Sequence, residues 1–345
     1  MRIVETHRRR AALALTAVAT LAFSLAGCSA ESDPGANSSQ GNKEVAVGGA
    51  QFGTADAETA KLGSDAQPGA FPRTVTHAAG ATEIKERPQR VVVLDTGELD
   101  AVLSLGITPV GMVTTKGAQP VPSYLADKVK DVPSVGTLNE LNVEEIAALE
   151  PDLILGSQLR ADKVYPQLSE VAPTVFSIRP GFPWKENFLL VGESLGMEKE
   201  AEAKLGDYAN KVSELKKNVP ANTTVSLVRF MPEKLRLYAN KSLIGVILHD
   251  AGIARPEKQN IDDLAVEISP ETIDQAAGDV IFYSSYGKPE VTGETAITEG
   301  AAWKNLPAVQ SGNAHQVDDD VWFLGLGPTG AMQIVDDLGH LLPKK

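Results

Sequence analysis

The chain has 345 residues, a formal net charge of −13, 5% aromatic residues and a single cysteine. The negative charge argues against nucleic acids and anionic lipid surfaces as partners, because both would repel the protein. The small number of aromatic rings argues against a surface on which bases or sugars stack. Because Cys28 is the only cysteine, an intrachain disulfide is excluded.

The first residues have the pattern of an export signal. Arginines between positions 2 and 10 precede an uncharged apolar run over residues 11–26, which is too short to span a membrane comfortably. The run ends in Leu25-Ala26-Gly27-Cys28, an order that resembles the lipobox of bacterial lipoproteins. We expect residues 1–27 to be a signal peptide, and we expect acyl chains on Cys28 to hold the mature protein on the extracytoplasmic face of the cell membrane. Both Sec and twin-arginine export remain open.

Residues 28–73 have the composition of a flexible tether. Gly, Ala, Ser, Asn, Gln and Asp dominate, and the few large apolar residues cannot build a core. About 270 residues remain, which is enough for one large or two medium domains.

Residues 74–182 alternate between strand and helix patterns, which favours a parallel sheet covered on both faces. We expect a hairpin over residues 74–84 that turns at Gly80, followed by an N-terminal α/β lobe. The pattern predicts buried strands at 90–94, 110–113, 153–155 and 174–177, and helices at 98–105 and 143–149.

Residues 183–220 predict two consecutive helices. Apolar residues recur at helical spacing from Trp184 to Leu195, and Gly196 follows where a helix would end. The second helix, over residues 198–217, has glutamates in its first turn and lysines in its last, which suits the helix dipole. We expect a long rigid helix that joins two lobes, with a ligand cleft between them.

Residues 221–345 predict a second α/β lobe. Strands are expected at 225–229, 235–238, 280–283, 314–317 and 321–323. Helices are expected at 243–249 and 329–342, and a further helix is expected to begin at Ser269-Pro270, with serine as its cap.

The two halves repeat a helix–strand unit. Residues 142–154 align with residues 269–281 without a gap, at an offset of about 127 residues. The alignment pairs chemically equal positions, which are Glu144 with Glu271, Asp152 with Asp279, and Ser157 with Ser284.

A series of motifs extends over about residues 74–342, namely 90–94, 105–111, 142–146, 150–154, Trp303, 306–309 and 312–314. In this order they resemble the iron-siderophore/cobalamin (FecCD-coupled) family of substrate-binding proteins. It implies a rigid two-lobe binding protein that acts as a monomer, is not an enzyme and holds no resident cofactor. Such a protein would capture a ferric siderophore and deliver it to an ABC importer. Haem or cobalamin is the alternative ligand, and catecholate, hydroxamate and carboxylate siderophores all remain open.

Candidate ligand-binding residues lie at predicted strand ends, where α/β proteins place their sites. Arginine suits an anionic chelate because its planar fork can donate two hydrogen bonds and stack on rings. The predicted set is Arg160, Arg229 and Arg236, with Arg179 nearby and with Trp184, Tyr286 and Trp322 as apolar walls.

Glu144 and Glu271 occupy matching places in the two lobes. The resemblance implies that acidic residues at these motif positions dock onto arginines of the membrane permease. Helix capping alone is the other explanation, and Glu145 is an alternative to Glu144.

Three other motifs are typical of nucleotide binding, hydrolysis and metal binding, and we expect none of these three functions. Residues 325–330 fit GxGxxG, but too little chain follows for a dinucleotide fold, so we expect these glycines to permit close packing. Residues 192–196 fit GxSxG, which leaves a secreted hydrolase using Ser194 with His315 or His340 as a weak alternative. Asp318-Asp319-Asp320 is expected to be a solvated turn, and we expect no metal ligands.

Overall fold

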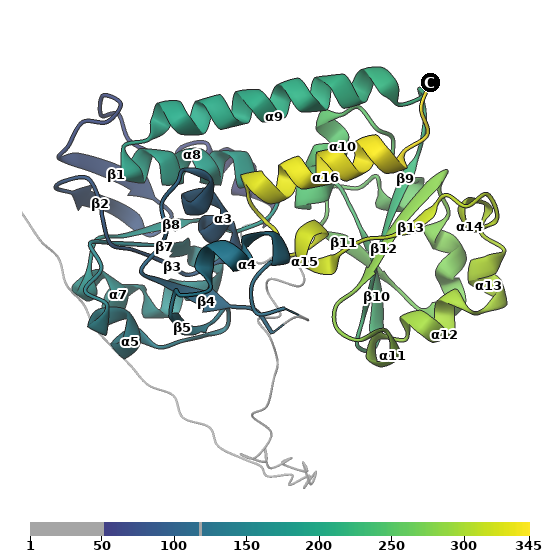
Figure 1. The fold of residues 1–345 in the computed structure, drawn as a ribbon, viewed down its shortest axis with the longest axis horizontal. Coiled ribbons are helices and arrows are strands. Elements are labelled where there is room, and N and C mark those ends of the chain that lie inside the picture. Colours follow the sequence, from purple (N-terminus) through teal and green to yellow (C-terminus); the bar gives the residue numbers. More distant parts are fainter. Residues whose placement is uncertain (1–51, 117–118) are drawn as a thin grey trace, which may run out of the picture. The chain divides into compact units, whose positions relative to one another are not determined.

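The computed structural model describes residues 52–116 and 119–345. It contains two lobes of mixed α/β structure, each built on its own sheet, and a long helix, α9 (Glu198–Asn218), that runs along both (Figure 1). The expected signal peptide, Cys28 and the first part of the expected tether lie outside the described residues. Within the described ranges, no helix is both long and apolar enough to cross a membrane.

The first lobe contains a six-stranded sheet in the order β6-β5-β4-β3-β7-β8, which is parallel except for the β5–β6 pair. Its strands are β3 (Val91–Val93), β4 (Gly111–Thr114), β5 (Ser134–Thr137), β6 (Glu140–Leu141), β7 (Leu153–Ser157) and β8 (Thr174–Ser177). Its helices are α3 (Thr96–Ser104), α4 (Ser123–Val129), α5 (Val143–Ala148), α6 (Gln158–Ala161), η2 (Asp162–Val164) and α7 (Tyr165–Val171). The four expected strands and two expected helices are all present.

Alternate residues of the first-lobe strands enter separate cores. Val91 and Val93 belong to the cluster on one face of the sheet, and Val92 belongs to the cluster on the other. This period of two explains why the buried strands have continuous apolar sequences.

Part of the expected tether is ordered, so the boundary at residue 73 is wrong. Residues from Phe52 onward form η1 (Phe52–Thr54) and α2 (Ala55–Thr59), and Ala55 is fully buried against Ile178 and Phe182. The chain then pairs with the predicted hairpin of β1 (Arg73–His77) and β2 (Gly80–Ile84) through backbone hydrogen bonds between Gly63 and Thr76. The few apolar side chains of this segment are sufficient to dock it, although they could not form a separate core.

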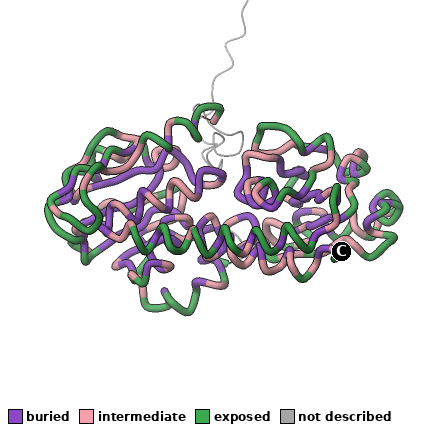
Figure 2. The backbone as a smooth tube through the Cα atoms, turned by 90° about the horizontal axis from the view of Figure 1, so that it is seen from above, coloured by how far each residue is buried: buried purple, intermediate pink, exposed green. Residues whose placement is uncertain are grey.

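The helix pair consists of α8 (Trp184–Leu195) and α9 (Glu198–Asn218), as predicted. Gly196 ends α8 in the left-handed conformation, with φ at 62°. Phe188 of α8 belongs to the core of the first lobe, whereas Trp184 of α8 and Tyr208 of α9 belong to that of the second. Figure 2 shows the exposed outer side of α9. The pair therefore contributes to both cores.

The second lobe contains a five-stranded mixed sheet in the order β11-β10-β9-β12-β13, in which β9, β12 and β13 are parallel. The strands are β9 (Val225–Met231), β10 (Lys234–Tyr238), β11 (Ala265–Ile268), β12 (Val280–Ser285) and β13 (Ala314–Gln316). The helices are α10 (Leu243–Asp250), η3 (Glu257–Gln259), η4 (Pro270–Ala276), α11 (Pro289–Thr292), α12 (Glu294–Thr298), α13 (Ala301–Lys304), α14 (Pro307–Gln310), α15 (Asp319–Trp322) and α16 (Pro328–Leu341).

Two local predictions in this lobe are wrong. Residues 321–323 do not form a strand, because α15 begins at Asp319, and the acidic residues of its first turn favour a helix start. The segment after Ser269 forms the 3₁₀ helix η4 with a kink at Thr272, and the Ser269 side chain does not cap it.

The repeated aspartates have the same structural role in both lobes. Asp152 accepts hydrogen bonds from the backbone N–H groups of Gln89 and Arg90 at 2.7 and 2.8 Å. Asp279 accepts one from the backbone N–H of Thr224 at 2.7 Å. Each carboxylate thus fixes the chain just before a central strand, β3 or β9, which supports the duplicated unit.

The GxGxxG motif forms a close contact between the lobes. Asp100 of α3 accepts hydrogen bonds from the backbone N–H groups of Thr329 and Gly330 at 3.0 and 2.9 Å, and thereby caps α16. A Cβ atom at Gly327 would lie 2.5 Å from the Cβ atom of Asp100. The glycines permit this approach, as expected from the sequence.

We predict that Gly327→Ala destabilises the protein by about 1–3 kcal/mol, because the added methyl group must displace the Asp100 side chain that caps α16. Thermal and urea unfolding would measure the loss. Gly339→Ala is the matched control in the same helix, since no atom lies within 4 Å of the place that its added methyl group would occupy. It should stabilise α16 by up to about 1 kcal/mol. Equal stability of the two variants would contradict the close contact.

Candidate functional site

A first arginine lies at the C-terminal ends of the parallel strands. Arg160 of α6 follows β7, and its Nε donates to Asp95 Oδ2 at 2.5 Å. Asp95 follows β3, is fully buried, and caps α3 by accepting a hydrogen bond from the Thr96 backbone N–H at 2.8 Å. The Ser157 hydroxyl lies 3.5 Å from the Asp95 carboxylate. We call Arg160, Asp95 and Ser157 the first-lobe arginine cluster.

A second arginine lies near the end of β9. Arg229 makes a bidentate ion pair with Asp319, with Nε–Oδ1 and Nη2–Oδ2 distances of 2.7 and 2.6 Å. Its Nη1 donates to the Tyr238 hydroxyl at 3.0 Å, and Ser284 donates to Asp319 at 2.8 Å. Burial alone would lower the pKa of Arg229, but Tyr238 and Asp319 raise this pKa above its ordinary value. We call Arg229, Asp319 and Ser284 the second-lobe arginine cluster.

One short segment of the chain lies between the two clusters. The Thr96 hydroxyl, next to Asp95, donates to the Leu324 carbonyl at 2.8 Å. The ring of Phe323 lies 5.1 Å from the Arg229 guanidinium carbon. Leu324 also lines an open cavity of about 410 Å³, together with Asp319 and with Gln119 from the first lobe. Residues of both lobes therefore converge at this cavity.

Two further residues of the predicted set lie beside the second-lobe cluster. Arg236 pairs with Arg229 across the β9–β10 ladder, and its Nε and Nη2 donate to Glu267 at 3.0 and 2.7 Å. The ring of Tyr286 lies 4.7 Å from the Arg229 guanidinium carbon and is partly exposed. The structure thus brings together three of the predicted second-lobe residues.

The two tryptophans expected as cleft walls lie in the core, each with 1% exposure, which corrects that expectation. Trp184 packs edge-on against Tyr208, and Trp322 packs against Phe282. Their large rings are needed to fill the space between the helix pair and the second sheet, which sequence reasoning did not foresee.

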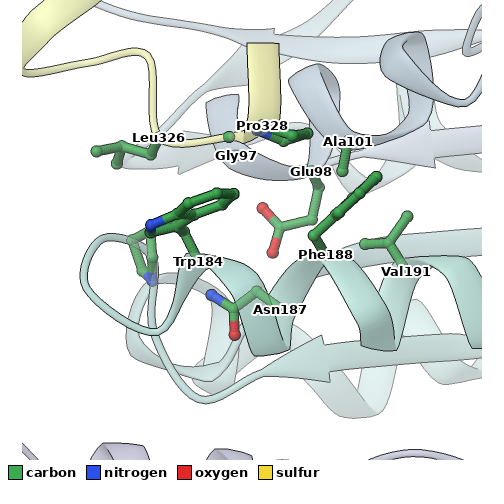
Figure 3. A pocket seen from close by; sticks show the side chains of 11 residues that line it. Gly97, Glu98, Ala101, Trp184, Asn187, Phe188, Val191, Leu326 and Pro328 are labelled. Carbon is green, nitrogen blue, oxygen red and sulfur yellow. The ribbon is translucent and has the colours of Figure 1, made fainter. Parts of the chain in front are cut away.

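A small cavity lies where α3, α8 and the start of α16 meet, as Figure 3 shows. Its volume of about 10 Å³ could hold roughly one water molecule. Three of its lining residues carry a buried polar atom without a hydrogen-bond partner among the described residues, namely Glu98 Oε2, Trp184 Nε1 and Asn187 Oδ1. Burial, and then the charge of Asp95, raise the pKa of Glu98 to about 7.

The candidate docking residues are exposed. Glu144 and Glu145 lie in the first turn of α5, and Glu271 lies in η4. The Asn142 side chain caps α5 by accepting from the Glu145 backbone N–H at 3.2 Å, so neither glutamate is needed as the cap.

The residues of the hydrolase and metal-binding alternatives have structural roles. Ser194 lies inside α8, fully buried, and its hydroxyl donates to the Leu190 carbonyl at 2.7 Å. It is not on a strand–turn–helix elbow, which contradicts the hydrolase alternative. Asp319 and Asp320 of the acidic run are engaged with Arg229 and with the Ser123 backbone N–H. Across residues 52–116 and 119–345, no three His, Cys, Asp or Glu side chains are arranged to hold a metal ion.

Sequence reasoning missed the carboxylate partners of the arginines. Asp95 directly follows a buried strand, and this position could have marked it as a site residue. Asp319 gave no comparable signal, because its acidic run is typical of a solvated turn and its partner Arg229 is 90 residues away.

A family model described as periplasmic binding protein matches residues 91–321 of the chain. The matched range includes both arginine clusters and the helix pair.

Individual relatives match most of the chain. The probable siderophore-binding lipoprotein YfiY of Bacillus subtilis is 39% identical over 280 residues, which cover 77% of this chain and 86% of that protein. The Fe(3+)-citrate-binding protein YfmC of the same organism is 31% identical over 258 residues, which cover 72% of this chain and 79% of that protein. The crystal structure of Staphylococcus aureus SirA complexed with staphyloferrin B matches with a TM-score of 0.70 and 33% sequence identity. The match covers 79% of this chain and 99% of the SirA chain.

We predict that Glu98 makes the protein less stable as the pH rises. Its pKa of about 7 in the folded protein exceeds the ordinary value of 4.5, so the folded state binds the extra proton between these values. The free energy of unfolding should therefore fall across this window, by on the order of 1–3 kcal/mol.

Urea unfolding at pH 5 and pH 8 would test this prediction by comparing the wild type with Glu98→Gln. The side chains that shift the pKa of Glu98 are Asp95, Arg160 and Ser177, and all remain in the variant. The variant should lose part of the pH dependence, and an identical dependence in both proteins would contradict a titrating Glu98.

Proposed function

The chain belongs to the periplasmic binding protein family, and from this membership we propose that it captures a ferric siderophore outside the cytoplasm and delivers it to an ABC importer. The observation that carries the proposal is a cavity of about 410 Å³ that residues of both lobes line, among them Asp319, the ion-pair partner of Arg229. Guanidinium N–H groups can donate to the oxygen atoms of an iron chelate. YfiY is named as a probable siderophore-binding lipoprotein, YfmC as a ferric-citrate-binding protein, and SirA was solved with staphyloferrin B.

The proposed ligand contacts are Arg160, Arg229, Arg236 and Tyr286. Haem has less support as a ligand, because haem iron takes an axial His, Cys, Met or Tyr. Among the described residues that line the cavity, none is of these types, and Tyr286, the one tyrosine among the proposed contacts, lies with its ring over the Arg229 guanidinium.

We also propose that acyl chains on Cys28 anchor the protein to the outer face of the cell membrane, after export through the signal peptide of residues 1–27. YfiY carries the word lipoprotein in its name. Labelling with radioactive palmitate should mark the wild-type protein, and label on a Cys28→Ser variant would disprove this attachment.

The binding proposal predicts a dissociation constant below about 10 μM, roughly 7 kcal/mol, for at least one ferric siderophore. Calorimetry on the mature chain, made soluble by Cys28→Ser, would measure it, and free iron should not bind. If no ferric chelate bound in this range, the proposed function would be wrong.

Arg229→Ala should weaken that binding by on the order of 1–3 kcal/mol, because a charge-assisted donor is lost. Arg87→Ala, an exposed arginine whose Nη2 bonds to the Gly196 carbonyl, is the matched control. A lower melting temperature of Arg229→Ala with unchanged affinity would show that Arg229 is only structural.

We further propose that Glu144 and Glu271 dock onto arginines of the permease, one from each lobe. Both carboxylates are exposed, and they occupy matching positions of the duplicated unit. Neighbouring Glu145 is the alternative contact in the first lobe.

The docking proposal predicts that Glu144→Ala combined with Glu271→Ala abolishes siderophore uptake in cells, while affinity in solution stays unchanged. A matched control removes two exposed glutamates of α9, Glu202 and Glu214, and should transport normally. Normal uptake by the first double variant at equal surface abundance would exclude the docking role, and a Glu145→Ala variant would then be measured in the same assay.

A further inference from the structure

We infer that the cavity lined by Asp319 and by residues of both lobes selects ferric chelates whose net charge is zero or one negative charge, and that it disfavours multiply charged anionic chelates. This inference rests on the proposed function and narrows its substrate class. Three hydroxamate groups carry one negative charge each and neutralise Fe³⁺. Three catecholate groups carry two each and leave a triply negative complex. The inferred class is therefore ferric trihydroxamates and mixed chelates of similar charge.

The charges of the arginines are already compensated within the protein. Arg160 pairs with Asp95, and Arg236 pairs with Glu267. Arg229 makes two parallel bonds to Asp319. An ion pair acts on a distant charge as a dipole, so its attraction for an anion is much weaker than that of an unpaired arginine.

The carboxylates of the two clusters are held in place by other bonds. Asp95 is fully buried and also caps α3 through the Thr96 backbone N–H. Asp319 also accepts a hydrogen bond from Ser284. An anionic ligand group could displace either carboxylate only by leaving a buried charge and its donors unpaired, which is costly.

An uncharged ligand oxygen does not need to displace a carboxylate from its arginine. The bonds of Arg229 to Asp319 and Tyr238 use three of the five N–H groups of its guanidinium. A hydroxamate or amide oxygen can therefore accept from Arg229 while its ion pair stays intact. The stacked ring of Tyr286 adds an apolar surface beside it.

The remaining charge at the cavity is negative. Asp318, Asp319 and Asp320 all line it, and its described lining residues include no Lys or Arg. Of the three, Asp319 alone is paired with an arginine of the described part of the chain. A polyanionic chelate would thus approach uncompensated carboxylates, and the net charge of −13 on the whole chain adds to the repulsion.

The test is calorimetry on the mature Cys28→Ser chain with ferric complexes of graded charge. The probes are ferrichrome as the neutral trihydroxamate, the ferric complex of staphyloferrin B as the carboxylate type, and ferric enterobactin as the triply negative tricatecholate. We expect the tightest chelate to carry at most one negative charge and to bind at least about tenfold tighter than ferric enterobactin. Its dissociation constant should change less than about twofold between roughly 50 and 500 mM salt, because few net charges interact.

A multiply negative chelate as the tightest ligand, or a roughly tenfold loss of affinity over this salt range, would overturn the inference while leaving the proposed function standing. Failure of every ferric chelate to bind would instead contradict the proposed function itself.

A charge variant gives an independent measurement. Asp318→Asn should shift the ratio of affinities toward the more anionic of two measurable chelates by about threefold or more, because one carboxylate at the cavity is removed. Asp274→Asn makes the same change of charge at an exposed position in η4 and should leave the ratio within about 1.5-fold. An equal ratio in both variants would count against the inference.

Discussion

A carboxylate of the first lobe completes a helix of the second. The N-terminus of α16 has only Gly327 as its own cap residue, which offers no side-chain acceptor. Asp100 takes that place by accepting from two backbone N–H groups of α16 and from the Tyr124 hydroxyl. The same approach brings Leu324 against Thr96, beside the first-lobe arginine cluster. The geometry of the site therefore depends on a capping interaction that lies outside it.

Two acidic residues of α3 show how hydrogen bonding decides the consequence of burial. Asp100 and Glu98 are both buried, and burial raises the pKa of each. Asp100 has three donors around it, whereas Glu98 has the Ser177 hydroxyl and one oxygen without a partner in the described part of the chain. Asp100 is therefore suited to hold the lobes together, and Glu98 is suited to exchange a proton near physiological pH.

Local sequence patterns were sufficient to predict most of the helices and strands. Apolar periodicity placed the helix pair, where α8 has the predicted bounds and α9 differs by one residue, and it placed the central strands of both sheets. It failed where tertiary contacts decide the structure. The segment from Phe52 docks because Ile178 and Phe182 cover it, and Trp184 is buried because the second-lobe core needs its ring. Sequence reasoning proposed arginines at or near strand ends as ligand contacts, but the long-range pairing of Arg229 with Asp319 has no local signature that would have predicted it.

The shared helix pair determines whether either lobe can fold without the other. Phe188 fills one core and Tyr208 the other, so neither half of the duplicated chain closes its apolar interior without α8 and α9. The lobes are repeats in architecture but not autonomous folding units. Unfolding of one lobe would expose apolar surface of the other, and the protein should lose its structure in a single cooperative transition rather than lobe by lobe.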